Sequence, residues 1–150
     1  MNLSSYLNGT KLKDFFELNL KSDEVTDLLE RFDMDVVYHF DRLREGTADY
    51  YSSATHTEGF ELRFDERQVL ETIWCYIRER SGFSKIESGS IGCFVPDTFE
   101  EIKALAISSG QRFSESANGA WLRLEDDEIW THYEFNDGGL SLITLMRPWH

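Results

Sequence analysis

Two segments of this chain alternate strictly between apolar and polar residues, and each is followed by a turn and a second apolar segment. Gly59–Phe64 alternates and Val69–Ile77 follows it. Ile129–Phe135 alternates in the same way, Asn136–Gly139 reads Asn-Asp-Gly-Gly, and Leu140–Met146 follows. Period-two alternation is typical of half-buried strands, and glycine-rich tetrapeptides between such strands favour tight turns. The pattern therefore predicts two antiparallel hairpins.

An amphipathic helix is predicted before each hairpin. Ser22–Phe32 has apolar residues at i, i+3, i+4 and i+7, with Ser22 placed as the N-cap. Asp97–Ile107 repeats this pattern, and there Thr98 and Glu101 have the spacing of a capping box. Because helix and hairpin recur in the same order, the sequence carries a loose internal duplication.

The duplication predicts an α+β fold of two loosely repeated units, each a helix followed by an antiparallel meander. We expect a single domain over residues 1–150, with a first unit over 1–80 and a second over 91–150. Parallel strands would need crossover helices between them, so the helices are expected to lie together on one face of the sheet.

Further elements are expected around these units. Asp49–Ala54 and Ala120–Glu125 are predicted strands that pair with the hairpins that follow them. The first eighteen residues are expected to add one short helix. The Ser- and Gly-rich stretch from Arg78 to Ser90 is expected to connect the two units.

Strand alternation separates the side chains of the two sheet faces. If the helices cover the face of Phe60, Leu62 and Phe64, the other face exposes aromatic residues among carboxylates. Exposed Trp and Tyr are enriched at interface hot spots, so this face is predicted to bind a partner. Its expected contact residues are Glu61, Glu71, Trp74, Tyr76, Trp121, Glu125, Trp130, His132 and Glu134.

An alternative for the same aromatic residues is a second small core. Residues 1–20, the 36–47 segment or the other unit could cover the face. Leu140–Met146 is apolar on both faces, which indicates a central strand that is covered on each side.

The densest acidic run is Glu125-Asp-Asp-Glu128. Its spacing lacks the alternating ligands, glycine and distal Glu of an EF-hand, so no metal is expected there. A solvated turn is one interpretation. In the other, Asp126 and Asp127 extend the partner-binding face.

Charge narrows the classes of partner. Lys and Arg number 15 and Asp and Glu number 28, so the net charge is 15 − 28 = −13. Phosphate would repel such a chain, which disfavours nucleic-acid binding. The first twenty residues resemble no signal peptide and no run is long enough to span a bilayer, so we expect a cytoplasmic protein without membrane contact.

Catalytic motifs are missing from the sequence. It has no H-E-x-x-H pattern, no G-x-S-x-G elbow and no phosphate-binding glycine loop. His132 between Trp130 and Glu134 could act as a general base, but a contact role is the interpretation favoured here. We therefore expect neither enzyme activity nor a cofactor.

Gly59–Asp65, Leu70–Tyr76 and Leu140–Met146 resemble the small acidic immunity proteins of bacterial polymorphic and contact-dependent toxin systems. The doubled helix-plus-meander plan is also similar to that of the β-lactamase inhibitor proteins, although this chain lacks their secretion signal and paired-cysteine framework. The resemblance implies a protein that binds and neutralises a cognate toxin domain, with a basic nuclease as the expected type.

Two other functions stay open at this point. One is a small-molecule or peptide binding module with an aromatic cleft. The other is a chaperone or adaptor whose aromatic face pairs with a second copy of the chain.

Overall fold

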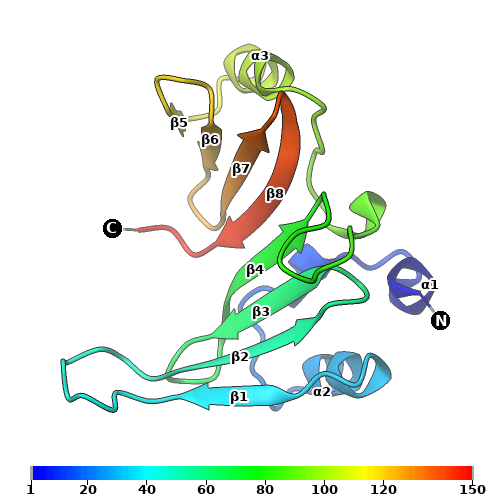
Figure 1. Cartoon of the computed structure of the whole chain (residues 1–150), viewed down its shortest axis with the longest axis vertical. Coiled ribbons are helices and arrows are strands. Elements are labelled where there is room, and N and C mark those ends of the chain that lie inside the picture. Colours follow the sequence, from blue (N-terminus) through cyan, green and yellow to red (C-terminus); the bar gives the residue numbers. More distant parts are fainter. Residues whose placement is uncertain (1, 150) are drawn as a thin grey trace.

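The computed structural model describes residues 2–149. Its strands form one antiparallel sheet of eight, in the order β1-β2-β3-β4-β8-β7-β6-β5 (Figure 1). The strands are β1 (Val36–His39), β2 (Tyr50–Thr55), β3 (Phe60–Phe64), β4 (Leu70–Tyr76), β5 (Phe113–Glu115), β6 (Trp121–Glu125), β7 (Trp130–Asn136) and β8 (Gly139–Met146). The helices are α1 (Leu3–Leu7), α2 (Asp23–Arg31) and α3 (Phe99–Ser109), with 3-10 turns η1 (Leu12–Phe15) and η2 (Ser88–Ser90). The predicted α+β class is confirmed.

The sheet consists of two meanders joined in the middle. β1–β4 follow one another in the chain and in space, and so do β5–β8. The last strand of each meander pairs antiparallel with the other, so that Trp74 lies opposite Thr144 and Cys75 opposite Ile143. In chain order, α2 precedes the first meander and α3 precedes the second. β4 and β8 therefore form the central seam of one continuous sheet.

Capping fixes the ends of the two longer helices. The Ser22 hydroxyl accepts a hydrogen bond from the N–H of Val25, and the Thr98 hydroxyl accepts one from the N–H of Glu101 at 3.2 Å. α3 ends at Gly110, whose φ of 69° lies in the left-handed region where glycine is favoured. These are the helix boundaries that the cap residues predict.

The main core lies between the helices and one face of the sheet. Strand residues such as Leu62, Ile73 and Ile143 pack there against apolar residues of the helices and the N-terminal segment. In Figure 1 this N-terminal segment, in blue, passes behind β3 and β4. Cys75 and Cys93 are free thiols, and burial raises the pKa of Cys93 to about 11. Both act as small apolar residues of this layer.

The sequence did not predict the two edge strands. β1 occupies the segment that was one possible cover of the aromatic face, and β5 contains only three residues. The expected N-terminal helix is split into α1 and η1. No helix among the described residues has the length and apolar character needed to cross a bilayer.

Candidate functional site: the open face of the sheet

The face of the sheet opposite the helices, here called the open face, gathers the aromatic residues. Strand register aligns one residue from each of five neighbouring strands, and this row contains Glu61, Trp74, Thr144, His132 and Arg123. Trp121 lies opposite Glu134, and Trp130 lies between Glu125 and Met146. Both meanders thus contribute residues to one continuous surface.

Glu71 joins this surface through a β-bulge. Arg63 pairs with Thr72, but the next residue, Phe64, pairs with Leu70, which leaves Glu71 as an extra residue in β4. A bulge re-aims the side chain of its extra residue. Oε1 of Glu71 lies 3.0 Å from Nε of Arg63, too poorly aligned for a hydrogen bond, and Oε2 lies 3.4 Å from Nη1 of Arg147.

One end of the open face is covered by the loop of residues 77–86. Phe83 stacks on Tyr76 and on His56, with ring centroids 4.1 Å apart in each pair, and is itself buried. Neighbouring backbone holds the loop in place, because Ser84 N–H donates to the carbonyl of His56 and Ile86 N–H to that of Tyr76.

Neither of the two covering segments considered from the sequence lies over the aromatic residues. Leu3, Leu7 and Leu12 pack into the main core on the other side of the sheet. The 36–47 segment forms the outermost strand and its loop. The four predicted aromatic residues Trp74, Tyr76, Trp121 and Trp130 are half-buried. Leu142 and Thr144 of the central strand are buried on this face, as the apolar pattern of residues 140–146 indicated.

Arg123 organises the tryptophans of the second meander. Its guanidinium carbon lies 5.5 Å from the ring centroid of Trp121, 4.5 Å from that of Trp130 and 5.1 Å from that of Trp149. Its Nη2 also lies 2.9 Å from a carboxylate oxygen of Glu125, and only 15% of the Arg123 side chain is exposed. Cation–π attraction is strongest for such partly desolvated guanidinium groups, so these rings are held in place.

A pocket of about 370 Å³ opens where β4 and β8 meet. Trp74, Met146 and Trp149 provide its apolar lining, and Arg63, Glu71 and Arg147 provide its charged lining. The pocket is therefore large enough for one partner side chain or a small ligand.

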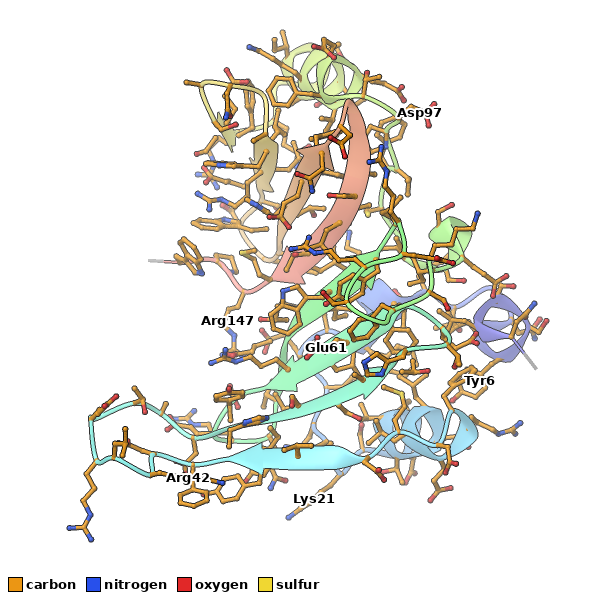
Figure 2. The ribbon with its side chains drawn as sticks, in the orientation of Figure 1. Tyr6, Lys21, Arg42, Glu61, Asp97 and Arg147 are labelled. Atoms are coloured by element: carbon orange, nitrogen blue, oxygen red, sulfur yellow. The ribbon has the colours of Figure 1, made fainter. Side chains whose placement is uncertain are left out.

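Arg147 fixes the charged side of this pocket. It donates to Glu17 at 3.1 Å, to Asp65 at 3.0 Å and to Glu71 at 3.4 Å. Burial alone would raise the pKa of Asp65, but hydrogen bonds from the Val69 N–H and from Arg147 hold it below its usual value. Figure 2 marks Glu61 on β3 and Arg147 just beyond the end of β8.

The open face is close to electrically neutral. On the strands of this face Glu61, Glu71, Glu125 and Glu134 give −4 and Arg63 and Arg123 give +2, so these side chains carry −2 of the total charge of −13. Two of the predicted partner-binding carboxylates are already paired, Glu71 with two arginines and Glu125 with Arg123. Glu61 accepts a hydrogen bond from Tyr76, and Glu134 makes no hydrogen bond or ion pair through its side chain within residues 2–149.

The acidic run lies toward the helix side of the sheet, where Asp126 and Glu128 line one pocket with Leu105 of α3. Asp126, Asp127 and Glu128 are exposed between β6 and β7. Asp127 pairs with Arg112 at 2.8 Å, and both side chains are largely exposed. Within residues 2–149, no group of three or more His, Cys, Asp or Glu side chains is placed to hold a metal ion.

His132 lies near the centre of the open face. Its ring centroid is 5.2 Å from that of Trp121, and its Nδ1 is buried without a hydrogen-bond partner in the described part of the chain. Burial and the charge of Arg123 lower its pKa below the usual 6.5, and Glu134 only partly opposes them. A neutral imidazole packed between these residues is suited to contact.

No protein-family model, curated protein or solved structure matches this chain. A functional assignment therefore depends on the open face itself and on the charges around it.

Three residues that contribute to this face were not predicted from the sequence. Phe83 lies in a connection without periodicity, and Arg147 and Trp149 follow the last strand. The only signal available was their residue type, because a loop and a tail carry no alternation that assigns them to a face.

Proposed function

We propose that this protein is a cytoplasmic immunity protein that binds a cognate bacterial toxin domain with its open face and blocks it without turnover. The observation that carries the proposal is the position of the tryptophans. Trp74, Trp121 and Trp130 lie on the strands of the sheet face that the helices leave uncovered, and Trp149 packs beside them. Half-buried Trp residues held in fixed positions are typical anchors of protein interfaces.

The charge distribution supports a partner with a basic surface. The centre of the open face is aromatic and nearly neutral, whereas Asp126, Asp127 and Glu128 form an exposed acidic turn at one end of the sheet, between β6 and β7. Residues 14–35 add eight acids against Lys21 and Arg31, a local charge of 2 − 8 = −6. An aromatic, nearly neutral centre is usual at protein interfaces, and the negative charge of the rest of the surface would accelerate encounter with a basic nuclease-type toxin.

We also propose that residues 1–80 and 91–150 are two copies of one unit whose last strands pair at the seam. Supporting this, each half has a helix before four antiparallel strands. Trp74 and Tyr76 come from the first half, and Trp121 and Trp130 from the second. The binding face then requires both units.

The test is a binding measurement between the full chain and the toxin domain encoded immediately upstream. Trp74→Ala is the informative variant, because Trp74 lines the pocket between β4 and β8, here called the seam pocket, and is not one of the tryptophans that pack on Arg123. A hot-spot truncation of this kind should weaken binding by about 2 kcal/mol, roughly 30-fold in Kd, in titration calorimetry.

The matched control is Ile107→Ala, which removes an exposed apolar side chain from α3 on the other side of the sheet. Its Kd should equal that of the wild type. Absence of any complex would overturn the immunity function. Equal weakening by Trp74→Ala and Ile107→Ala would retain the toxin partner but reject the open face as its site.

The seam pocket favours a second candidate function, a module that binds a small molecule or an extended peptide. A volume of about 370 Å³ lies within the range of ligand pockets. A ligand of this kind would raise the melting temperature of the isolated chain. For an immunity protein, only the toxin domain would raise the melting temperature. A thermal-shift screen on wild type and Trp74→Ala separates the two.

A further inference from the structure

The two edges of the sheet differ in how they are protected. β5 has only three residues, with Arg112 before it and Glu115, paired with Lys103 at 3.0 Å, at its end. β1 reads Val-Val-Tyr-His, without charge or proline, and is paired only along the side that faces β2. Short length and charge are what protect sheet edges from unwanted pairing, so β5 is protected and β1 is not.

Apolar side chains gather on and beside this unprotected edge. Five of the nine exposed large apolar residues of the described chain lie within residues 36–43. They are Val36, Val37, Tyr38, Phe40 and Leu43, which are 41% to 77% exposed. Register places Val37 on the open face, opposite Ser52 and in line with Arg63, and Tyr38 on the helix side, opposite Tyr51. A strand added to β1 would therefore bury apolar surface on both faces.

The β1–β2 hairpin is ordered by its own aromatic contacts. Tyr38 stacks on Tyr51 with ring centroids 5.0 Å apart and packs beside Phe40 at 5.8 Å, and its hydroxyl donates to Asp49 at 2.5 Å. Figure 1 shows the loop of this hairpin extending away from the body of the protein, and Figure 2 places Arg42 on it. Because these contacts already hold β1 extended, β1 loses little further conformational entropy when another strand docks on it.

We propose that the β1 edge pairs antiparallel with the β1 edge of a second copy of this chain, which joins two sheets into one. Charge favours this occupant. Asp33 and Asp35 precede β1, whereas Arg42 and Arg44 follow it. Antiparallel pairing brings the acidic flank of one copy beside the basic flank of the other, and a parallel arrangement would bring the acidic flanks together.

A basic partner protein fits this edge less well. Residues 33–44, which include the acidic flank, carry Asp33, Asp35 and Asp41 against Arg42 and Arg44, a charge of 2 − 3 = −1, in a chain whose total is −13. The repulsion between two copies is therefore small at this edge, and a cationic partner gains little attraction there. Self-pairing at β1 leaves the central tryptophans of the open face free, so it is independent of the proposed function.

Sedimentation velocity on the full chain tests the proposal over concentrations from about 1 to about 500 µM. The wild-type mass should rise from 17.5 kDa toward 2 × 17.5 = 35 kDa. Val37→Lys places a charge on the edge, as natural edges do, and should raise the midpoint of association at least about tenfold. Ile107→Lys adds the same charge at another exposed apolar residue, on α3, and should behave as the wild type does.

Hydrogen exchange of the amides of residues 36–39 provides the second measurement, with far-UV circular dichroism to verify that each variant is folded. Protection of these amides should increase with protein concentration in the wild type and in Ile107→Lys. A mass that stays at 17.5 kDa throughout would overturn the proposal. So would association that survives Val37→Lys, or protection of residues 36–39 that appears only when the toxin domain is added.

Discussion

At the residue scale, Arg123 is the side chain on which the tryptophans of the second meander depend. It contacts three tryptophan rings and one carboxylate with little exposure to solvent. Removing it would leave the Glu125 charge without this partner and the rings without their common contact. The surface that we assign to binding therefore has an internal support of its own.

We expect Arg123→Met to lower the free energy of unfolding by about 2–3 kcal/mol, because a partly buried ion pair and several cation–π contacts are lost together. Arg123→Lys should have an intermediate effect, since it keeps the charge but loses the planar group. Urea denaturation followed by far-UV circular dichroism measures both, and avoids the change in tryptophan emission that the variants themselves cause.

The control for this measurement is Arg112→Met. Arg112 pairs with Asp127 at 2.8 Å and donates to the Glu125 carbonyl oxygen at 3.0 Å, but the side chains of Arg112 and Asp127 are 69% and 89% exposed. Exposed pairs contribute little, so the change should stay below about 0.5 kcal/mol. If Arg112→Met and Arg123→Met lower the free energy of unfolding equally, the tryptophan contacts of Arg123 do not contribute to stability.

His132 gives the stability a dependence on pH. Burial lowers its pKa in the folded state below the ordinary value of 6.5. As pH falls through 6.5, the unfolded chain takes up a proton that the folded chain resists, so stability is lost. We expect this destabilisation by His132 to be absent well above pH 6.5 and to grow as the pH falls below that value.

Urea denaturation at a series of pH values from 7.5 to about 5 tests this expectation. Because many carboxylates also titrate at the acidic end, the comparison is between wild type and His132→Gln. The wild type should lose stability more steeply than His132→Gln below pH 6.5. Parallel curves would show that His132 titrates normally in the folded protein.

At the element scale, the loop of residues 77–86 depends on one glycine. Gly59 has a φ of 79°, and a Cβ there would lie 2.2 Å from the Ser84 carbonyl oxygen and 2.7 Å from the Ile86 nitrogen. Because both atoms belong to the backbone, neither can rotate away. The close approach lets the loop place Phe83 over Tyr76.

Gly59→Ala should therefore displace the loop and lower the free energy of unfolding by more than about 2 kcal/mol. Gly138→Ala is a matched control, since Gly138 also has a φ of 79° but, apart from its chain neighbours, no atom of residues 2–149 within 4 Å of its Cβ position. It should show the cost of the left-handed backbone alone. Equal costs in thermal denaturation would mean that the loop contact contributes nothing.

Elements with a buried face were predictable from the sequence, and those at the edges were not. β3 and β7 alternate because one of their faces packs on the core. β1 has three exposed residues out of four, and β5 is too short to show a period. Where burial does not select alternate positions, alternation carries no information about the strand.

At the scale of the whole molecule, β4 and β8 join the two halves into one sheet over one core. A single core cluster contains residues from both halves, such as Leu62 and Ile143. We expect one unfolding transition, with the same urea midpoint for peptides of β3 and β7 in hydrogen exchange mass spectrometry. Two separated midpoints would show that each half folds by itself.

The sequence was enough to predict which strand residues share the candidate site, but not which side chains contact one another there. Alternation of apolar and polar residues is enough to assign Trp74, Trp121 and Trp130 to one face of the sheet. It says nothing about Arg123 pairing with Glu125, which depends on side-chain geometry. Nor does it reveal that Arg147 joins Glu17, which is 130 positions away in the sequence.

The central position of β8 also concerns synthesis on the ribosome. β8 is the last strand of the described chain to be made, yet it separates β4 from β7 in the sheet. Until residues 139–146 leave the exit tunnel, both of those strands keep an edge without a partner. A nascent chain stalled before that point would display two half-sheets ready to pair with other strands, so prompt completion of translation protects this protein from aggregation.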